Sequence, residues 1–360
     1  MMLTIYTLFN DPNIVNAVIQ RVLQTRKDTI YWQQYLDFRR TTTRVFKDYI
    51  GQVTGVMAGS INSRYGEKPI RERRNIGSGY GEIAYLGDRY QISVDRLSEL
   101  QDLIDKYNAA KPADQIAAMQ DIVNFIYDDY RQVLLAPHKR MDMVLGSMLM
   151  TGEATVKNKD DNAGGVNLLE IKLPLKFITP ETEAKTKFIT YLQQKVNELK
   201  SIYGTFPKMI MSRGTFVKNI IGSEEFGDKF KMQLTGNEMY LSTGLITSQL
   251  ASSIFTGIGL PAIEIKEDYV LDQTGKNVQI YADDRITLLP QDKIGYMRFH
   301  TPYEAVDGVP GRNYTQADGE MLISGYKDGN GRYLEYTAEW IPQITNPNLI
   351  VNFDLTTMNA

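Results

Sequence analysis

The sequence contains no cysteine among its 360 residues. This absence excludes disulfides, thiolate nucleophiles and cysteine-ligated zinc. Histidine is nearly absent too, because only His138 and His300 occur, far apart in the chain. A Ser-His-Asp triad would have to use one of them, and both positions suit an ordinary polar residue better. Few groups remain for enzyme chemistry, so we expect a protein that is not an enzyme and that has no catalytic residue, cofactor or metal.

Long apolar runs and a strong net charge are also missing. No segment approaches the roughly 18 consecutive apolar residues of a membrane helix. The first residues, MMLTIYTLFNDPN, lack the basic start and the small-residue cleavage site of a signal peptide. The net charge of -3 is unlike that of strongly basic nucleic-acid-binding domains. We therefore expect synthesis in the cytoplasm and no membrane partner.

The composition is that of an ordinary folded chain, but it is rich in tyrosine and methionine. Hydrophobic residues make up 42% and charged residues 23%, which is typical of globular proteins. At this length two subdomains are expected rather than one core. The 22 tyrosines and 15 methionines suit extensive contacts between proteins.

Three segments show helical periodicity. Residues 11–26 form an amphipathic pattern, with Asp11 as cap and Pro12 as first residue. Residues 114–150 carry apolar side chains at steps of three and four, and Pro137 predicts a kink or break near Val133. The segment from Thr179, taken as the cap, to Gly204, taken as the terminator, predicts a third helix with Pro180 as its first residue.

Residues 44–94 differ from these helices. They contain eight glycines and only scattered apolar residues, which predicts a long hairpin that completes its packing on another chain. The segment GSGYG (residues 77–81) lacks the Gly-Lys-Ser/Thr ending of a phosphate loop and is interpreted as a flexible turn. The hairpin also contains five basic residues that are candidates for contact with an acidic neighbouring subunit: Arg64, Lys68, Arg71, Arg73 and Arg74. A solvated loop face fits this cluster equally well.

Paired acids occur at Asp160–Asp161 and at Asp283–Asp284. The first pair lies in the turn of a predicted hairpin, within KNKDDNAGG. The second lies between two strands, where aspartate is favoured for its local hydrogen bonds. Neither pair has further carboxylates or histidines at a readable spacing, as a metal or acid–base site would need. We interpret both pairs as turns.

The second half of the chain predicts a compact α/β subdomain followed by a β-rich tail. FPKMIMS predicts a buried strand followed by a short helix, and PAIEIKEDYVL predicts another strand. In the tail, YLEYTAEWIPQI and LIVNFDLTT predict two strands on either side of a turn at residues 346–348. We expect both tail strands to return and pack beside the long helix.

Four stretches together resemble the major capsid proteins of tailed bacteriophages, of the lambda head-protein type. They are VLGSMLMTGEATV, FPKMIMSRGTFVKNI, IEIKEDYVLDQTGKNVQIYADDRITLLPQDKIGYM and AEWIPQITNPNLIVNFDL. The resemblance implies an α+β fold, the Hong Kong 97-like capsid fold. It divides the chain into an N-terminal arm (1–43), an extended loop (44–94), the spine helix with the first part of a peripheral subdomain (95–180), an axial α/β subdomain (181–299) and a β-rich return to the peripheral subdomain (300–360).

The resemblance also implies a function in assembly. Such subunits form pentamers and hexamers and enclose double-stranded DNA in an icosahedral head, built in the cytoplasm of a host bacterium. The implied partners are other copies of the chain, a portal, a separate scaffold or cementing protein, and packaged DNA bound without sequence specificity. An encapsulin-like shell that encloses a cargo enzyme is the alternative on the same fold. A carboxylate-dependent hydrolase using either aspartate pair and a phage tail-tube protein are further alternatives.

Overall fold

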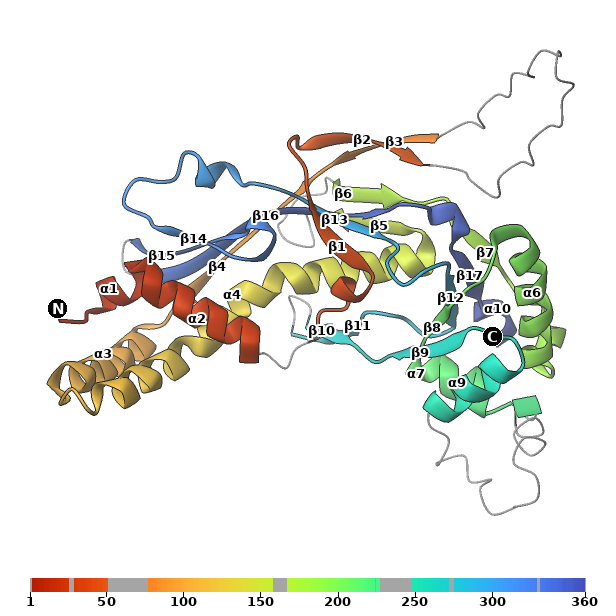
Figure 1. The fold of residues 1–360 in the computed structure, drawn as a ribbon, viewed down its shortest axis with the longest axis horizontal. Coiled ribbons are helices and arrows are strands. Elements are labelled where there is room, and N and C mark those ends of the chain that lie inside the picture. Colours follow the sequence, from red (N-terminus) through yellow and green to blue (C-terminus); the bar gives the residue numbers. More distant parts are fainter. Residues whose placement is uncertain are drawn as a thin grey trace, which may run out of the picture.

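The protein is described by a computed structural model that covers residues 2–25, 29–50, 77–157, 167–223, 225–226, 248–271, 275–328 and 331–359. The molecule is elongated, and the long helix α4 runs along it (Figure 1). Buried side chains form two cores, one around α4 and a six-stranded sheet and the other around a five-stranded sheet. Two cores agree with the two subdomains expected from the length, while the limits of the five predicted segments stay predictions.

The spine of the molecule is helix α4 (Gln115–Thr151), which at 37 residues is about 55 Å long for a rise of 1.5 Å per residue. It ends at Gly152, whose φ of 72° favours glycine. The break considered near Val133 does not occur, because the helix continues through Pro137. Proline costs the helix a backbone hydrogen bond, but Pro137 and its neighbours along this face are buried in the core, and such packing supplies most of a helix's stability.

Three smaller helices pack against the N-terminal half of α4. Helix α3 (Val94–Ala109) was not predicted from the sequence, although Ser93 caps it by accepting the N–H of Arg96. The arm contains α1 (Ile5–Asn10) and α2 (Pro12–Thr25). The predicted cap of α2 is confirmed, because Asp11 Oδ1 accepts the N–H of Asn13 at 2.9 Å.

A six-stranded sheet covers one face of α4. Its strands follow the order β1 (Leu36–Arg40), β13 (Gly295–His300), β16 (Gly331–Ile344), β15 (Leu322–Asp328) and β14 (Tyr314–Gln316), with β4 (Ala84–Ile92) paired along the other side of β16. The β1–β13 pair is parallel and the remaining pairs are antiparallel. Alternate residues of β16, including Leu334, Ala338 and Trp340, are fully buried.

A two-stranded hairpin projects from this body (Figure 1). Strands β2 (Val45–Ile50) and β3 (Gly77–Glu82) are antiparallel, with Val45 opposite Glu82. The interpretation of residues 77–81 as a turn is therefore wrong, because these residues belong to strand β3 and pair with β2. The five basic candidates, Arg64, Lys68, Arg71, Arg73 and Arg74, lie outside the described residues.

The predicted hairpin after α4 is confirmed as β5 (Glu153–Lys157) and β6 (Asn167–Lys172), which pair antiparallel. Residues 160 and 161 between them lie outside the described ranges. A third small hairpin consists of β10 (Tyr269–Leu271) and β11 (Asn277–Gln279).

The second core surrounds a five-stranded sheet at the opposite end of the molecule from α1 and α3 (Figure 1). Its order is β7 (Lys176–Ile178), β17 (Val351–Asp354), β12 (Arg285–Leu289), β8 (Lys208–Ser212) and β9 (Ala262–Lys266). The helices of this region are α6 (Phe188–Tyr203), α7 (Arg213–Thr215) with the π-helix Phe216–Ile221, α9 (Ser248–Gly257) and α10 (Thr356–Asn359). Short 3-10 turns span Trp32–Gln34, Thr182–Lys185, Tyr303–Ala305, Asp318–Glu320 and Pro347–Leu349.

Two predictions need correction here. The helix predicted from Thr179 begins only at Phe188, and no side chain of its preceding residues caps it. Instead the Glu225 carboxylate accepts the N–H groups of Ile189 and Thr190 at 2.9 and 3.1 Å. The tail strands β16 and β17 enter different sheets. Strand β17 meets the spine at the end of α4, where Asn352 Nδ2 donates to the carbonyls of Leu149 and Met150.

Candidate functional site: surfaces for assembly

The aspartate pair at residues 283 and 284 forms a tight turn, as predicted. Asp284 has a φ of 59°, a conformation that aspartate tolerates better than most residues. Its N–H donates to Thr215 Oγ1 at 2.8 Å. The Asp283 carboxylate accepts the hydroxyl of Ser212, the residue that caps α7. The turn therefore joins the start of β12 to the end of β8.

The same turn reaches the last helix. The Asp284 carboxylate accepts from Asn359 and lies 3.5 Å from Lys218 Nζ. Throughout the described ranges no group of three or more His, Asp or Glu side chains is placed to hold a metal ion. Asp283 and Asp284 thus have structural partners, and the other pair, Asp160 and Asp161, lies outside the described residues.

The two histidines occupy structural positions. His138 is buried in α4, where its ring stacks on Trp32 with the centroids 5.7 Å apart and packs on Trp340. His300 lies on β13, and its Nδ1 is 2.8 Å from Glu339 Oε2. They lie in separate environments and do not form a joint site.

The base of the β2–β3 hairpin carries a network centred on Glu339. This carboxylate is 2% exposed on β16, yet it accepts two bonds from the half-exposed Arg44. Arg44 Nε lies 3.1 Å from Oε2 and its terminal nitrogen 2.6 Å from Oε1. Beside it, Tyr85 Oη donates to Glu304 Oε1 at 2.9 Å. Sequence reasoning missed this network, because Arg44 and Glu339 are 295 residues apart.

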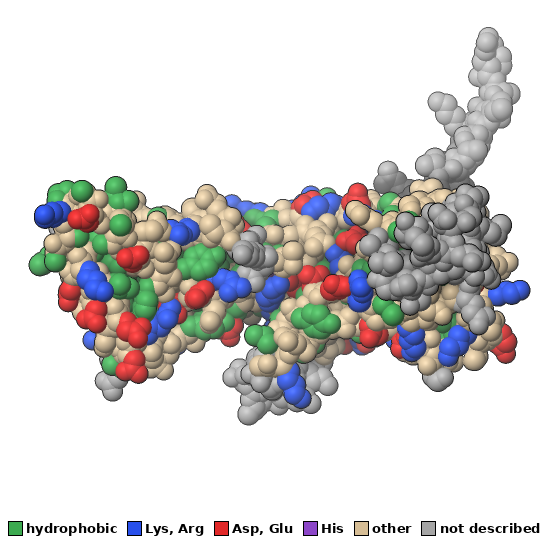
Figure 2. Space-filling model, turned by 90° about the horizontal axis from the view of Figure 1, so that it is seen from below, with side chains coloured by type: hydrophobic (Ala, Val, Ile, Leu, Met, Phe, Trp, Pro, Cys, Tyr) green, Lys and Arg blue, Asp and Glu red, His purple; other side chains and the backbone are tan. Residues whose placement is uncertain are grey.

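An acidic surface covers α3 and the first half of α4. Figure 2 shows acidic side chains gathered at the end of the molecule that carries these helices. The exposed acids of this surface are Asp95, Glu99, Asp102, Asp105, Asp114, Asp121 and Asp128. Within the described residues no ion pair is made to any of them, and only Lys106 and Lys111 are exposed bases there. We call this region the acidic helical surface; the sequence carried its signal as an excess of acids over residues 95–129.

A buried clamp holds the segment after α2 on the spine. Trp32 N–H donates to Asp142 Oδ1 on α4 at 2.9 Å, and Lys139 Nζ donates to the carbonyl of Thr29 at 2.7 Å. Asp142 is fully buried and 3.5 Å from Lys139 Nζ. Burial raises the pKa of Asp142 to about 6, although the Trp32 bond and Lys139 oppose this. Among the acidic residues in the described part of the chain, Asp142 has the pKa that lies farthest from its ordinary value.

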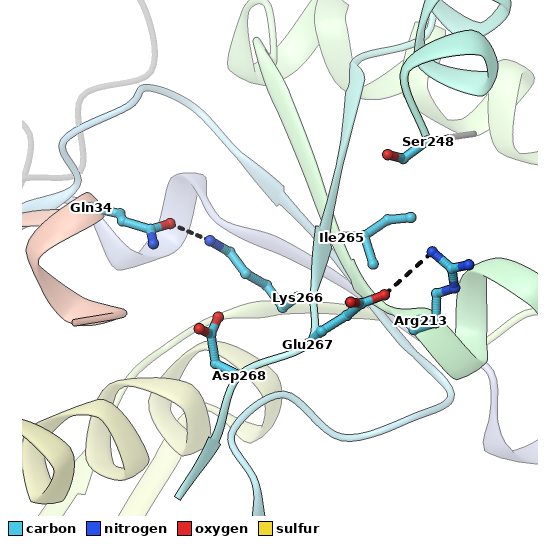
Figure 3. Close-up of a pocket in the computed structure, with 7 residues that line it drawn as sticks. All are labelled: Gln34, Arg213, Ser248, Ile265, Lys266, Glu267 and Asp268. Atoms are coloured by element: carbon cyan, nitrogen blue, oxygen red, sulfur yellow. Dashed lines mark hydrogen bonds and ion pairs between the residues drawn. The ribbon is translucent and has the colours of Figure 1, made fainter. Parts of the chain in front are cut away.

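A shallow polar depression lies where this segment meets the second sheet (Figure 3). Lys266, 5% exposed, donates to Gln34 and is 2.7 Å from Glu264 Oε1. Burial works against the ionised form of Glu264, but Lys266 and Tyr35 bring its pKa below the ordinary value. Arg213, at the other side, pairs with Glu267 at 3.3 Å. Lys266 and Arg213 are thus each paired with a carboxylate, and Asp268 accepts the hydroxyl of Thr29 at 3.1 Å. The depression is therefore better suited to joining two parts of the chain than to holding a ligand.

Comparison with known proteins places this architecture. No protein-family model and no curated protein matches the sequence. A provisionally assigned capsid protein of a prophage (E. coli CFT073) matches over 96% of this chain and 98% of its own, with 12% identity and a TM-score of 0.58. A phage-related protein from Bordetella bronchiseptica RB50 covers 95% and 96% with 8% identity and a TM-score of 0.49. The capsid structure of cyanophage P-SCSP1u covers 91% and 88% with 12% identity and a TM-score of 0.43.

The first match establishes the fold. The chain has the α+β, Hong Kong 97-like fold of phage capsid proteins, as the four sequence stretches predicted. None of the helices in the described ranges is long and apolar enough to cross a membrane.

Proposed function

We propose that this chain is the structural, non-catalytic subunit of an icosahedral phage head, which assembles as pentamers and hexamers and encloses double-stranded DNA. The match to a prophage capsid protein along nearly the entire length of both chains supports this proposal most strongly. The head would be assembled in the cytoplasm of a host bacterium. Portal, scaffold or cementing proteins would be its further partners.

Charge complementarity suggests how neighbouring copies contact each other. Within the described residues, the seven exposed acids of the acidic helical surface make no ion pair, while the segment 64–74 contains five basic and two acidic residues. We infer that this segment of one copy contacts the acidic helical surface of the next. Such head-to-tail contacts close into rings when the rotation between copies allows it, and charges of opposite sign also fix the register of an interface.

Electron microscopy of the protein expressed alone tests the proposal. We expect closed shells or sheets of hexamers from the intact chain, and small rings or monomers from a variant lacking residues 60–80. A monomer in both cases, at high concentration and across salt, would reject the capsid function. Shells that copurify with a cargo enzyme instead of DNA from the native host would favour the compartment alternative.

Charge reversal tests the contact between copies. Changing Arg71, Arg73 and Arg74 to Glu should prevent shell formation, and so should changing Asp102 and Asp105 to Lys. Combining the two sets should restore shells, because each reversed surface again meets its opposite charge. Reversal of Glu181 and Glu183, which are exposed acids far from α3, is the matched control and should leave assembly unchanged. If the combined variant did not form shells, the basic segment would not contact the acidic helical surface.

A further inference from the structure

We propose that Glu339 is a positioning residue that fixes the direction in which the β2–β3 hairpin leaves the six-stranded sheet. This inference rests on the proposed function for its consequence, since a hairpin that reaches a neighbouring copy must leave its own subunit in a defined direction. Its structural part, the control of the hairpin by Glu339, stands on intramolecular contacts alone.

The first step of the argument is the burial of Glu339. A carboxylate that is 2% exposed is costly to remove from water. It is tolerated when it is paired and when several donors satisfy it. Here Arg44 supplies two donors and His300 Nδ1 a third. Arg44 and His300 therefore both bond the same carboxylate on β16.

The second step is the geometry of the Arg44 contact. A guanidinium that bonds both oxygens of one carboxylate is planar and directional, unlike a lysine, which acts as a point charge. Both bonds of Arg44 to Glu339 are at most 3.1 Å long. The contact therefore fixes the orientation of the Arg44 side chain as well as its distance from the sheet.

The third step is where Arg44 lies. It immediately precedes Val45, the first residue of β2, and its carbonyl accepts the N–H of Ile83 at 3.0 Å, just beyond the end of β3. This bond continues the hairpin ladder by one rung toward the sheet. Arg44 thus immediately precedes β2, the outgoing strand of the hairpin that projects from the body (Figure 1), and orienting Arg44 orients that strand.

The second strand of the hairpin is held by a different contact. After Ile83 the chain enters β4, whose residues 84–92 pair with β16 in continuous register, and Tyr85 is directly opposite Glu339. Tyr85 also bonds Glu304. The returning strand is therefore fixed by a backbone ladder. The outgoing strand is held to the sheet through Thr41, whose N–H donates to the carbonyl of Phe299 at 2.8 Å, and beyond that residue the side-chain contact between Arg44 and Glu339 ties it to β16. Loss of that contact should release one side of the hairpin and leave the sheet intact.

Because the chain has no cysteine, two spin labels can be placed without removing native thiols. We would attach spin labels at Asp48→Cys on β2 and Lys327→Cys on β15. Pulsed electron–electron double resonance of the unassembled protein then measures the distribution of distances between the two labels. A narrow distribution is expected for the parent. Glu339→Gln and Arg44→Gln should each give a broader, shifted distribution, and the double variant should be no broader than either single one.

The control is Glu335→Gln. Glu335 lies on β16, on the same face as Glu339 and four residues before it. Its replacement by glutamine also removes charged contacts, to Arg89 and Tyr326. Among the described residues, the side-chain contacts of Glu335 are with Arg89, Arg312 and Tyr326 and not with Arg44 or His300, so the distance distribution of Glu335→Gln should match that of the parent. Arg44→Gln guards against misfolding, because the Arg44 side chain is half exposed. An unchanged distribution in Arg44→Gln and Glu339→Gln would overturn the positioning role.

Electron microscopy of the same unlabelled variants tests the consequence. With thermal unfolding comparable to that of Glu335→Gln, Glu339→Gln and Arg44→Gln should lose closed shells while Glu335→Gln retains them. Normal shells from variants with a broadened hairpin would refute the link to assembly. If the parent itself forms no shells, the proposed function fails, and the distance measurements still decide the role of Glu339.

Discussion

Replacement of Asp142 by asparagine should change how the stability of the protein depends on pH. Asp142 is fully buried in α4 and accepts the N–H of Trp32. Burial raises its pKa from 3.8 to about 6. Asparagine has nearly the same shape and can still accept the Trp32 bond through its amide oxygen, but it cannot ionise.

The sign follows from the direction of the pKa change. Because the pKa of Asp142 is higher in the folded state, its protonation stabilises the fold. That stabilisation is complete below pH 3.8 and is lost as the pH rises through about 6. Each pH unit in this interval corresponds to about 1.4 kcal/mol, so ionisation of Asp142 costs the wild type about 3 kcal/mol at neutral pH.

The free energy of unfolding of Asp142→Asn, relative to wild type, should therefore increase by about 3 kcal/mol between pH 4 and pH 7 and then level off. Urea unfolding at low protein concentration, followed by tryptophan fluorescence, measures it. The chain has two tryptophans, Trp32 and Trp340, both fully buried and 6.4 Å apart beside this clamp. Asp121→Asn, an exposed change on the same helix, is the control for the loss of a carboxylate from α4. Parallel pH profiles for wild type and Asp142→Asn would refute the reasoning.

Two further substitutions test packing and capping. Gly295→Ala should destabilise the protein by about 3 kcal/mol or more, because a Cβ there would lie 1.9 Å from the carbonyl oxygen of Gln343; thermal unfolding measures this, with Gly325→Ala, whose nearest contact would be 3.3 Å, as the milder control. Glu225→Ala should cost about 1–2 kcal/mol, because it leaves the first N–H groups of α6 without their acceptor; chemical denaturation against Glu198→Ala, an exposed change on α6, gives the difference, and equal costs would show that Glu225 is not a cap.

Local patterns along the chain were sufficient for much of the fold. The apolar steps of residues 114–150, the acid and proline at Asp11 and Pro12, and the turn residues between β5 and β6 each specify structure through neighbours in sequence. The order of these elements, with four short stretches, led to the capsid fold. Prediction failed where distant residues decide the outcome. Thr179 and Pro180 look like a helix start, but the start of α6 is set by Glu225, 36 residues beyond Ile189.

The candidate contacts between subunits were predictable only as charge. The basic cluster around Arg71 was visible in the sequence, and it stays a prediction because it lies outside the described residues. The acidic helical surface could have been recognised by its composition, but only with α3 assigned as a helix. The Arg44–Glu339 contact gave no local signal, since a glutamate in the middle of an apolar strand looks like a surface position until the fold brings an arginine to it.

The position of β17 has a consequence for synthesis of the protein. This strand, near the end of the sequence, lies between β7 and β12, whose residues precede it by more than sixty positions. The five-stranded sheet therefore lacks an inner strand until residues 351–354 have left the ribosome. Domains commonly fold in order from the N-terminus during translation, but here the second core must wait for β17. A nascent chain with α4 already folded would therefore be unable to complete the five-stranded sheet before β17 has emerged.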